Sequence, residues 1–67
     1  MTANRIQEVR PIEAPAPIMA EARTNCAERL IVRGHADEAE RFALGERDGA
    51  WAFRHEVARL LALGGGV

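Results

Sequence analysis

The chain has 67 residues, enough for one domain at most, and a chain of this length buries a smaller fraction of its surface than a larger domain does. Its single cysteine excludes an internal disulfide, and its net charge of −1 removes the overall attraction that a basic protein has for nucleic acid or an anionic membrane. No apolar run approaches the roughly 18 residues of a membrane span, and the N-terminal residues lack the apolar core of a signal peptide. We therefore expect a cytoplasmic protein that does not contact a membrane.

Residues 1–16 are predicted to form an N-terminal arm. Pro11, Pro15 and the following Pro17 remove amide donors and favour an extended backbone. Every third residue in part of this arm is apolar, which is the repeat of a polyproline II helix and would place three side chains on one side: Ile6, Val9 and Ile12. A disordered tail fits the same composition, and so does a short helical turn over residues 4–9.

The first helix is predicted over residues 17–33. Proline suits the first helical position, and Gly34 suits the left-handed residue that follows a helix. The apolar residues recur at the helical repeat in a stripe that comprises Met19, Ala22, Cys26, Ala27, Leu30 and Ile31. This helix is therefore amphipathic and is expected to cover another surface.

Two further helices are predicted, beginning at Asp37 and near Ala50. Asp37 and Glu40 have the spacing of a capping box, and the short apolar face behind them comprises Ala39, Phe42 and Ala43. Asp48 is expected to cap the last helix, which ends at Gly64 and has an apolar stripe of Ala50, Phe53, Val57, Leu60 and Leu61. The solvent side of this helix is expected to carry Arg54, His55, Glu56 and Arg59.

The segment between Leu44 and Gly49 decides whether the second half of the chain forms one helix or two. In one unbroken helix, Gly45 and Gly49 would lie on the apolar stripe and let another helix approach closely. Each glycine inside a helix costs about 1 kcal/mol relative to alanine, and the cap at Asp48 would be unused. We therefore predict a turn over residues 46–49. The expected fold is all-α, with two or three helices over residues 17–63, an extended proline-containing arm, and a flexible glycine-rich end at residues 64–67.

The residue types that support metal binding or catalysis are scattered along the chain. Cys26, His35 and His55 lack the close pairs of structural zinc sites, and the chain contains no phosphate-binding glycine motif, no serine and no tyrosine. The acids near Asp37 are explained by the start of a helix. We predict a protein that is not an enzyme and that uses no metal or cofactor.

We predict instead a small protein-binding module, such as an accessory subunit, an adaptor or an inhibitor of a larger protein. Small scaffolds without disulfides often gain stability by association, so a protein partner or a homodimer is expected. Trp51 either covers the edge of the core beside Ala58 or anchors a partner, since tryptophan is enriched among residues that dominate binding energy. The predicted surface comprises Trp51, Phe53, Val57, Leu60 and Leu61, with Met19, Leu30 and the arm residues Ile6, Val9 and Ile12.

A dimeric DNA-binding transcriptional regulator is the alternative. Arg54 and Arg59, joined by Arg47, would contact phosphates from an exposed helix face, and a dimer would double the basic patch. Glu56 lies within this cluster, however, and residues 35–49 carry five acids against two arginines, a net charge of −3. No recognition-helix pattern is present, so DNA binding is the less favoured hypothesis.

Overall fold

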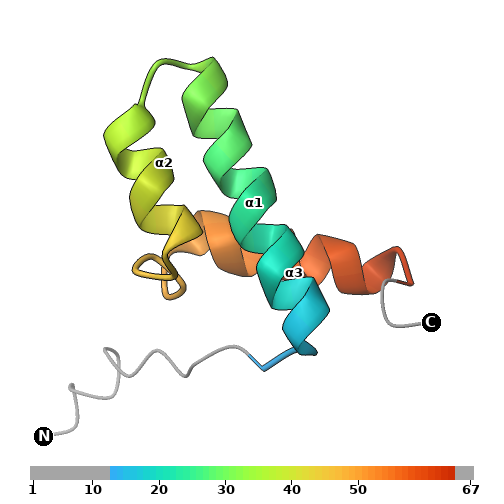
Figure 1. The fold of residues 1–67 in the computed structure, drawn as a ribbon. Coiled ribbons are helices and arrows are strands. Elements are labelled where there is room, and N and C mark those ends of the chain that lie inside the picture. Colours follow the sequence, from blue (N-terminus) through green and yellow to red (C-terminus); the bar gives the residue numbers. More distant parts are fainter. Residues whose placement is uncertain (1–12, 65–67) are drawn as a thin grey trace, which may run out of the picture.

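The structure is a computed structural model that describes residues 13–64, and this part of the chain contains three α-helices and no strand (Figure 1). The helices are α1 (Ala16–Val32), α2 (Ala36–Ala43) and α3 (Trp51–Ala62). α1 packs against both other helices. The prediction of an all-α unit is confirmed, in its three-helix form. The arm residues Ile6, Val9 and Ile12 lie outside the described part of the chain.

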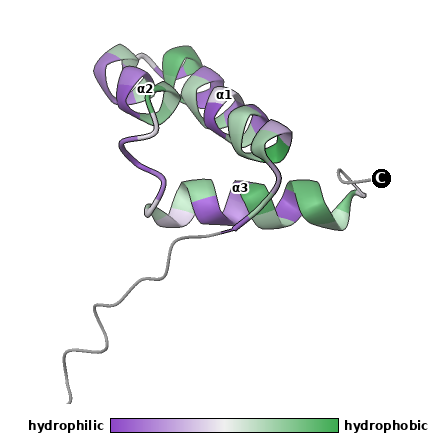
Figure 2. Cartoon of the chain, turned by 60° about the horizontal axis from the view of Figure 1, so that its bottom comes forward, coloured by the Kyte–Doolittle hydropathy of each residue, from purple (hydrophilic) through white to green (hydrophobic). Residues whose placement is uncertain are grey.

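α1 and α2 form an antiparallel hairpin, and α3 crosses α1 near one end of that hairpin (Figures 1 and 2). The tip of the hairpin is a tight turn at Gly34, which has a φ of 85°. The N–H of Gly34 donates to the carbonyl of Ile31 at 3.0 Å, and the N–H of His35 donates to the carbonyl of Leu30 at 2.8 Å. This pair of bonds is the Schellman ending of a helix, so the predicted stop at Gly34 is confirmed.

The chain also breaks between α2 and α3, as predicted, with a turn over residues 44–49. Gly45 has a φ of 86° and follows the last residues of α2. Its N–H donates to the carbonyl of Phe42 at 3.1 Å, and the N–H of Glu46 donates to the carbonyl of Arg41 at 2.9 Å. Gly45 therefore ends α2 by the same motif that Gly34 uses for α1, and it does not lie inside a longer helix.

Both predicted side-chain caps are wrong. α2 follows His35 without a side-chain cap, and Asp37 lies inside its first turn, where a negative charge favours the helix N-terminus. α3 follows Ala50, also without a side-chain cap. The carboxylate of Asp48 instead accepts two hydrogen bonds from the guanidinium of Arg23 in α1. A bidentate, charge-assisted pair is stronger than a single capping bond, so the long-range partner replaces the local one.

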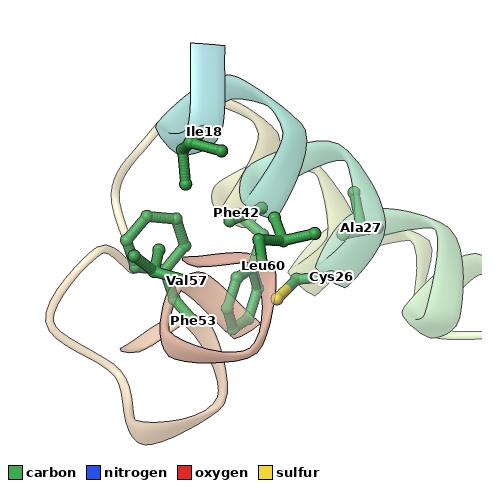
Figure 3. Packing of buried hydrophobic residues seen from close by; sticks show 9 residues of the cluster. Ile18, Cys26, Ala27, Phe42, Phe53, Val57 and Leu60 are labelled. Atoms are coloured by element: carbon green, nitrogen blue, oxygen red, sulfur yellow. The ribbon is translucent and has the colours of Figure 1, made fainter. Parts of the chain in front are cut away.

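The core lies where α1 packs against the other two helices (Figure 3). The large side chains at its centre, Phe53 and Val57, are fully buried, and each contributes roughly 1.5–3 kcal/mol relative to an exposed side chain. Ala22 is also fully buried, and its small side chain lets α1 approach its neighbours closely. The complete set of buried apolar residues is Ile18, Ala22, Cys26, Ala27, Ala39, Phe42, Phe53, Val57 and Leu60.

Four residues of the helices are exposed or buried in the structure contrary to the prediction. Ile31 is 59% exposed because α3 crosses only part of α1 and leaves the last turn uncovered (Figure 1). Leu61 is 42% exposed at the edge of the α3 stripe, and Ala43 is exposed at the end of α2. Glu56, which was expected to face solvent, is only 1% exposed. The burial of a charged side chain in so small a core requires compensating partners, which are described below.

Candidate functional site

α3 buries one side and exposes the other, and this divides the predicted binding surface. Phe53, Val57 and Leu60 are buried in the core, so they hold the fold together and are not accessible to a partner. Trp51 is 76% exposed, so it does not cover the core, and Leu61 is also accessible. Met19 and Leu30 are half-buried at the core edge, and neither lies on α3.

The exposed side of α3 is mostly apolar. Trp51, His55, Ala58 and Ala62 recur at intervals of about one helical turn, and all four are exposed. Leu61 lies beside this stripe. We call these five residues the outer face of α3. Because two of them are alanines, another helix can approach the second half of α3 closely.

Trp51 and His55 stack on each other at the start of this outer face. Their ring centroids are 4.8 Å apart and the ring planes are inclined by 21°. The stack restricts the rotation of the indole while leaving most of its surface accessible. An ordered side chain loses less conformational entropy when it is bound, so this arrangement favours Trp51 as an anchor for a partner.

The orientation of α3 is held by the carboxylate of Glu56. It accepts hydrogen bonds from Asn25 Nδ2 at 2.9 Å and Arg29 Nη2 at 2.9 Å, both on α1. Arg59, one turn later on α3, donates from Nε at 3.2 Å and from Nη2 at 2.6 Å. These bonds, those of Arg59 foremost, lower the pKa of Glu56 to about 2, although burial acts in the opposite direction. The buried charge is therefore satisfied and ties α3 to α1.

Sequence reasoning missed the role of Glu56, although a signal was present. Positions 53, 56, 57 and 60 have the spacing of one helical face, so a residue at position 56 belongs to the buried side. Because glutamate is charged, Glu56 was predicted to face solvent. Arg59 three positions later was the clue that a buried carboxylate would have a partner.

The three arginines of the DNA-binding alternative do not share one face. Arg54 and Arg59 are about 140° apart around α3, because five residues separate them. Arg59 forms an ion pair with Glu56, and Arg47 in the turn forms one with Glu38 at 3.4 Å. These carboxylates offset the positive charge that phosphate binding requires.

The three residues considered for metal binding or catalysis, Cys26, His35 and His55, have different surroundings in the structure. Cys26 is buried, its thiol donates to the carbonyl of Ala52 at 3.8 Å, and burial raises the pKa of the thiol. His35 precedes α2, and His55 stacks on Trp51. Within residues 13–64, no group of three or more histidine, cysteine or acidic side chains is placed to hold a metal ion.

Comparisons of the chain with protein-family models, curated proteins and solved structures found no match. None of the three described helices combines the length and the apolar character needed to cross a membrane.

Proposed function

We propose that the protein is a small binding module that attaches to a larger protein through the outer face of α3. The observation that carries this proposal is Trp51, a large apolar ring that is 76% exposed and ordered by its stack on His55. Isolated exposed apolar residues are common on soluble proteins. On α3, however, Trp51 shares one short helix with the exposed Leu61, and the exposed Leu63 follows directly.

The energetics support binding through this face. Removing a large apolar side chain from water contributes roughly 1.5–3 kcal/mol, and tryptophan is enriched among residues whose truncation weakens interfaces most. Glu56 and its arginine partners hold α3 against α1, so the face is preorganised and less entropy is lost on docking. A helix that is exposed, ordered and partly alanine fits against a helix or a groove of a partner protein.

The test is purification of the tagged full-length chain from its own cell, followed by light scattering and mass spectrometry of the eluted peak. We expect a larger protein at fixed stoichiometry with the wild type. The Trp51→Ala variant should bind this partner at least about tenfold more weakly and keep its melting temperature. Val32→Ala is the matched control, because Val32 is 85% exposed but lies on α1. Unchanged affinity of Trp51→Ala together with a large loss of thermal stability would refute the proposal.

A further inference from the structure

A groove lies in the corner between the α1–α2 hairpin and α3. The hairpin extends past α3, so α3 covers only one end of it (Figures 1 and 2). The groove has a volume of about 390 Å³ and is lined by Cys26, Arg29, Leu30, Arg33, Phe42 and Ala52. Most of these side chains are apolar, whereas Arg29 in the last turn of α1 and Arg33 directly after the helix bring positive charge to the groove.

Of the two arginines that line this groove, Arg33 is the one whose charge is not neutralised by a carboxylate of the described residues. Arg29 is paired with the buried Glu56. Among residues 13–64, Arg33 forms no ion pair, and its side chain is exposed at the end of α1. The groove therefore fits an apolar side chain that has a carboxylate beside it.

The chain itself carries an apolar side chain with carboxylates near it in sequence, on α2 and the turn that follows. Leu44 is 65% exposed and is flanked in sequence by Glu40, one turn earlier, and by Glu46. Glu40 and Glu46 are exposed and form no ion pair within the described residues. In the acidic segment 35–49, Leu44 is the one large apolar side chain that the structure exposes. We call Leu44, Glu40 and Glu46 the acidic knob.

The knob does not fill the groove of its own chain. Phe42 lines the groove, and Leu44 follows two residues later, about 200° further around the helix. Leu44 therefore leaves α2 on the side away from the groove, and only another molecule can bring the knob to it.

We propose that two copies of this chain associate by placing Leu44 of one copy in the groove of the other, with Glu40 and Glu46 facing Arg33. The contact joins three residues of one copy to six lining residues of the other, fewer than the roughly 20–30 residues a side of a standard stable interface, so the association is weak and reversible. It depends on exposed charges and is therefore reduced by salt. It uses none of the outer face of α3, so it goes beyond the proposed function and can be tested independently of it.

The test is sedimentation velocity of the full chain over a concentration series at low and high salt. We expect mass to increase with concentration for the wild type, and less so at high salt. Arg33→Glu alone, the double variant Glu40→Arg/Glu46→Arg alone, and Leu44→Ala alone should each weaken association at least about tenfold. Glu13→Arg is the control for a charge reversal elsewhere on the surface, because Glu13 is exposed and belongs to neither the groove nor the knob.

Mixing the two charge-reversed variants gives the deciding result. Between two different variants, a contact joins either the reversed groove to the reversed knob or the native groove to the native knob, so each contact that they form joins opposite charges. We expect association of the mixture to return to the wild-type level, with circular dichroism showing that each variant is folded. A wild-type chain that stays monomeric up to about 1 mM would overturn the proposal. So would folded variants that associate as the wild type does, or a mixture that stays dissociated.

Discussion

The carboxylate of Glu56 on α3 and the guanidinium of Arg29 on α1 are 2.9 Å apart, and the two residues differ sharply in exposure. The Glu56 side chain is 1% exposed, whereas that of Arg29 is 49% exposed. The pair therefore links a buried charge to the surface, and Arg59 does the same from within α3. A charge placed in this way is stable only while its donors remain in position.

The first prediction concerns acid unfolding. The pKa of Glu56 is about 2 in the folded protein, below the value of about 4.3 expected for an unfolded chain. A carboxyl group whose pKa is lowered by folding contributes stability above its unfolded pKa, and this contribution is lost as the pH falls toward the folded pKa. We expect the free energy of unfolding to fall between about pH 4.5 and pH 2, by up to roughly 3 kcal/mol from this group.

Urea titrations at several pH values measure this effect, and Glu56→Gln is the informative variant. It keeps the shape of the side chain but cannot ionise, so it should be less stable at neutral pH and should lose most of the pH dependence over the same range. Glu28→Gln is the control, because Glu28 is an exposed acid on α1. An acid transition in Glu56→Gln as steep as that of the wild type would show that other carboxyl groups cause it.

The second prediction compares two glycines that have the same backbone conformation. Gly34 and Gly45 have φ values of 85° and 86°, so alanine at either position costs about 1–2 kcal/mol in backbone energy. A Cβ at Gly34 would meet no atom within 4 Å, whereas one at Gly45 would lie 3.3 Å from Nε of Arg23. We expect Gly45→Ala to lower the melting temperature more than Gly34→Ala does, and chemical denaturation gives the difference in free energy. Equal losses would show that Arg23 moves aside without cost.

The features that sequence predicted well are local. Gly34 and Gly45 act within a few residues of the helix ends they terminate, and the apolar repeat placed Phe53, Val57 and Leu60 together on one side of α3. The two main errors have distant causes. Asp48 does not cap α3 because its carboxylate binds Arg23, which lies 25 residues away in the sequence. Glu56 is buried because partners that include Asn25, 31 residues away, donate hydrogen bonds to it. Only the packed structure brings these pairs together.

The candidate site was also predicted only in part, because it too depends on how the helices pack. The sequence places Trp51 in the C-terminal helix, but the helical repeat does not tell which other helix packs on that helix or how far it extends along it. Trp51 was singled out for its residue type. It lies about 200° around α3 from Phe53, so it is exposed once α1 covers the side of α3 that carries Phe53. The groove was not predicted at all, because its lining comes from three helices whose relative placement is a tertiary property.

The third prediction concerns the pair of Arg23 and Asp48. The two side chains are 33% and 29% exposed, so water screens their attraction in part. We expect each alanine variant to be destabilised and a double-mutant cycle to give a coupling of about 1 kcal/mol, because Arg23 donates two hydrogen bonds in a bidentate arrangement. Thermal unfolding of the wild type, the two single variants and the double variant measures it. A coupling near zero would mean that the pair of Arg23 and Asp48 does not stabilise the turn over residues 44–49.

The fourth prediction uses Cys26 as a reporter of how firmly α3 packs. The thiol is 4% exposed, donates to the carbonyl of Ala52 on α3, and has a pKa raised first by burial. Only the thiolate of an accessible cysteine reacts readily, so labelling by a thiol reagent should be slow in the native protein and fast in urea. Glu56→Gln loosens the contact between α1 and α3 and should speed labelling under native conditions. Trp51→Ala, a change on the opposite side of α3, should leave the rate unchanged. Rapid labelling of the wild type would contradict the burial of Cys26, and equal rates for Glu56→Gln and the wild type would show that α3 remains docked without the carboxylate.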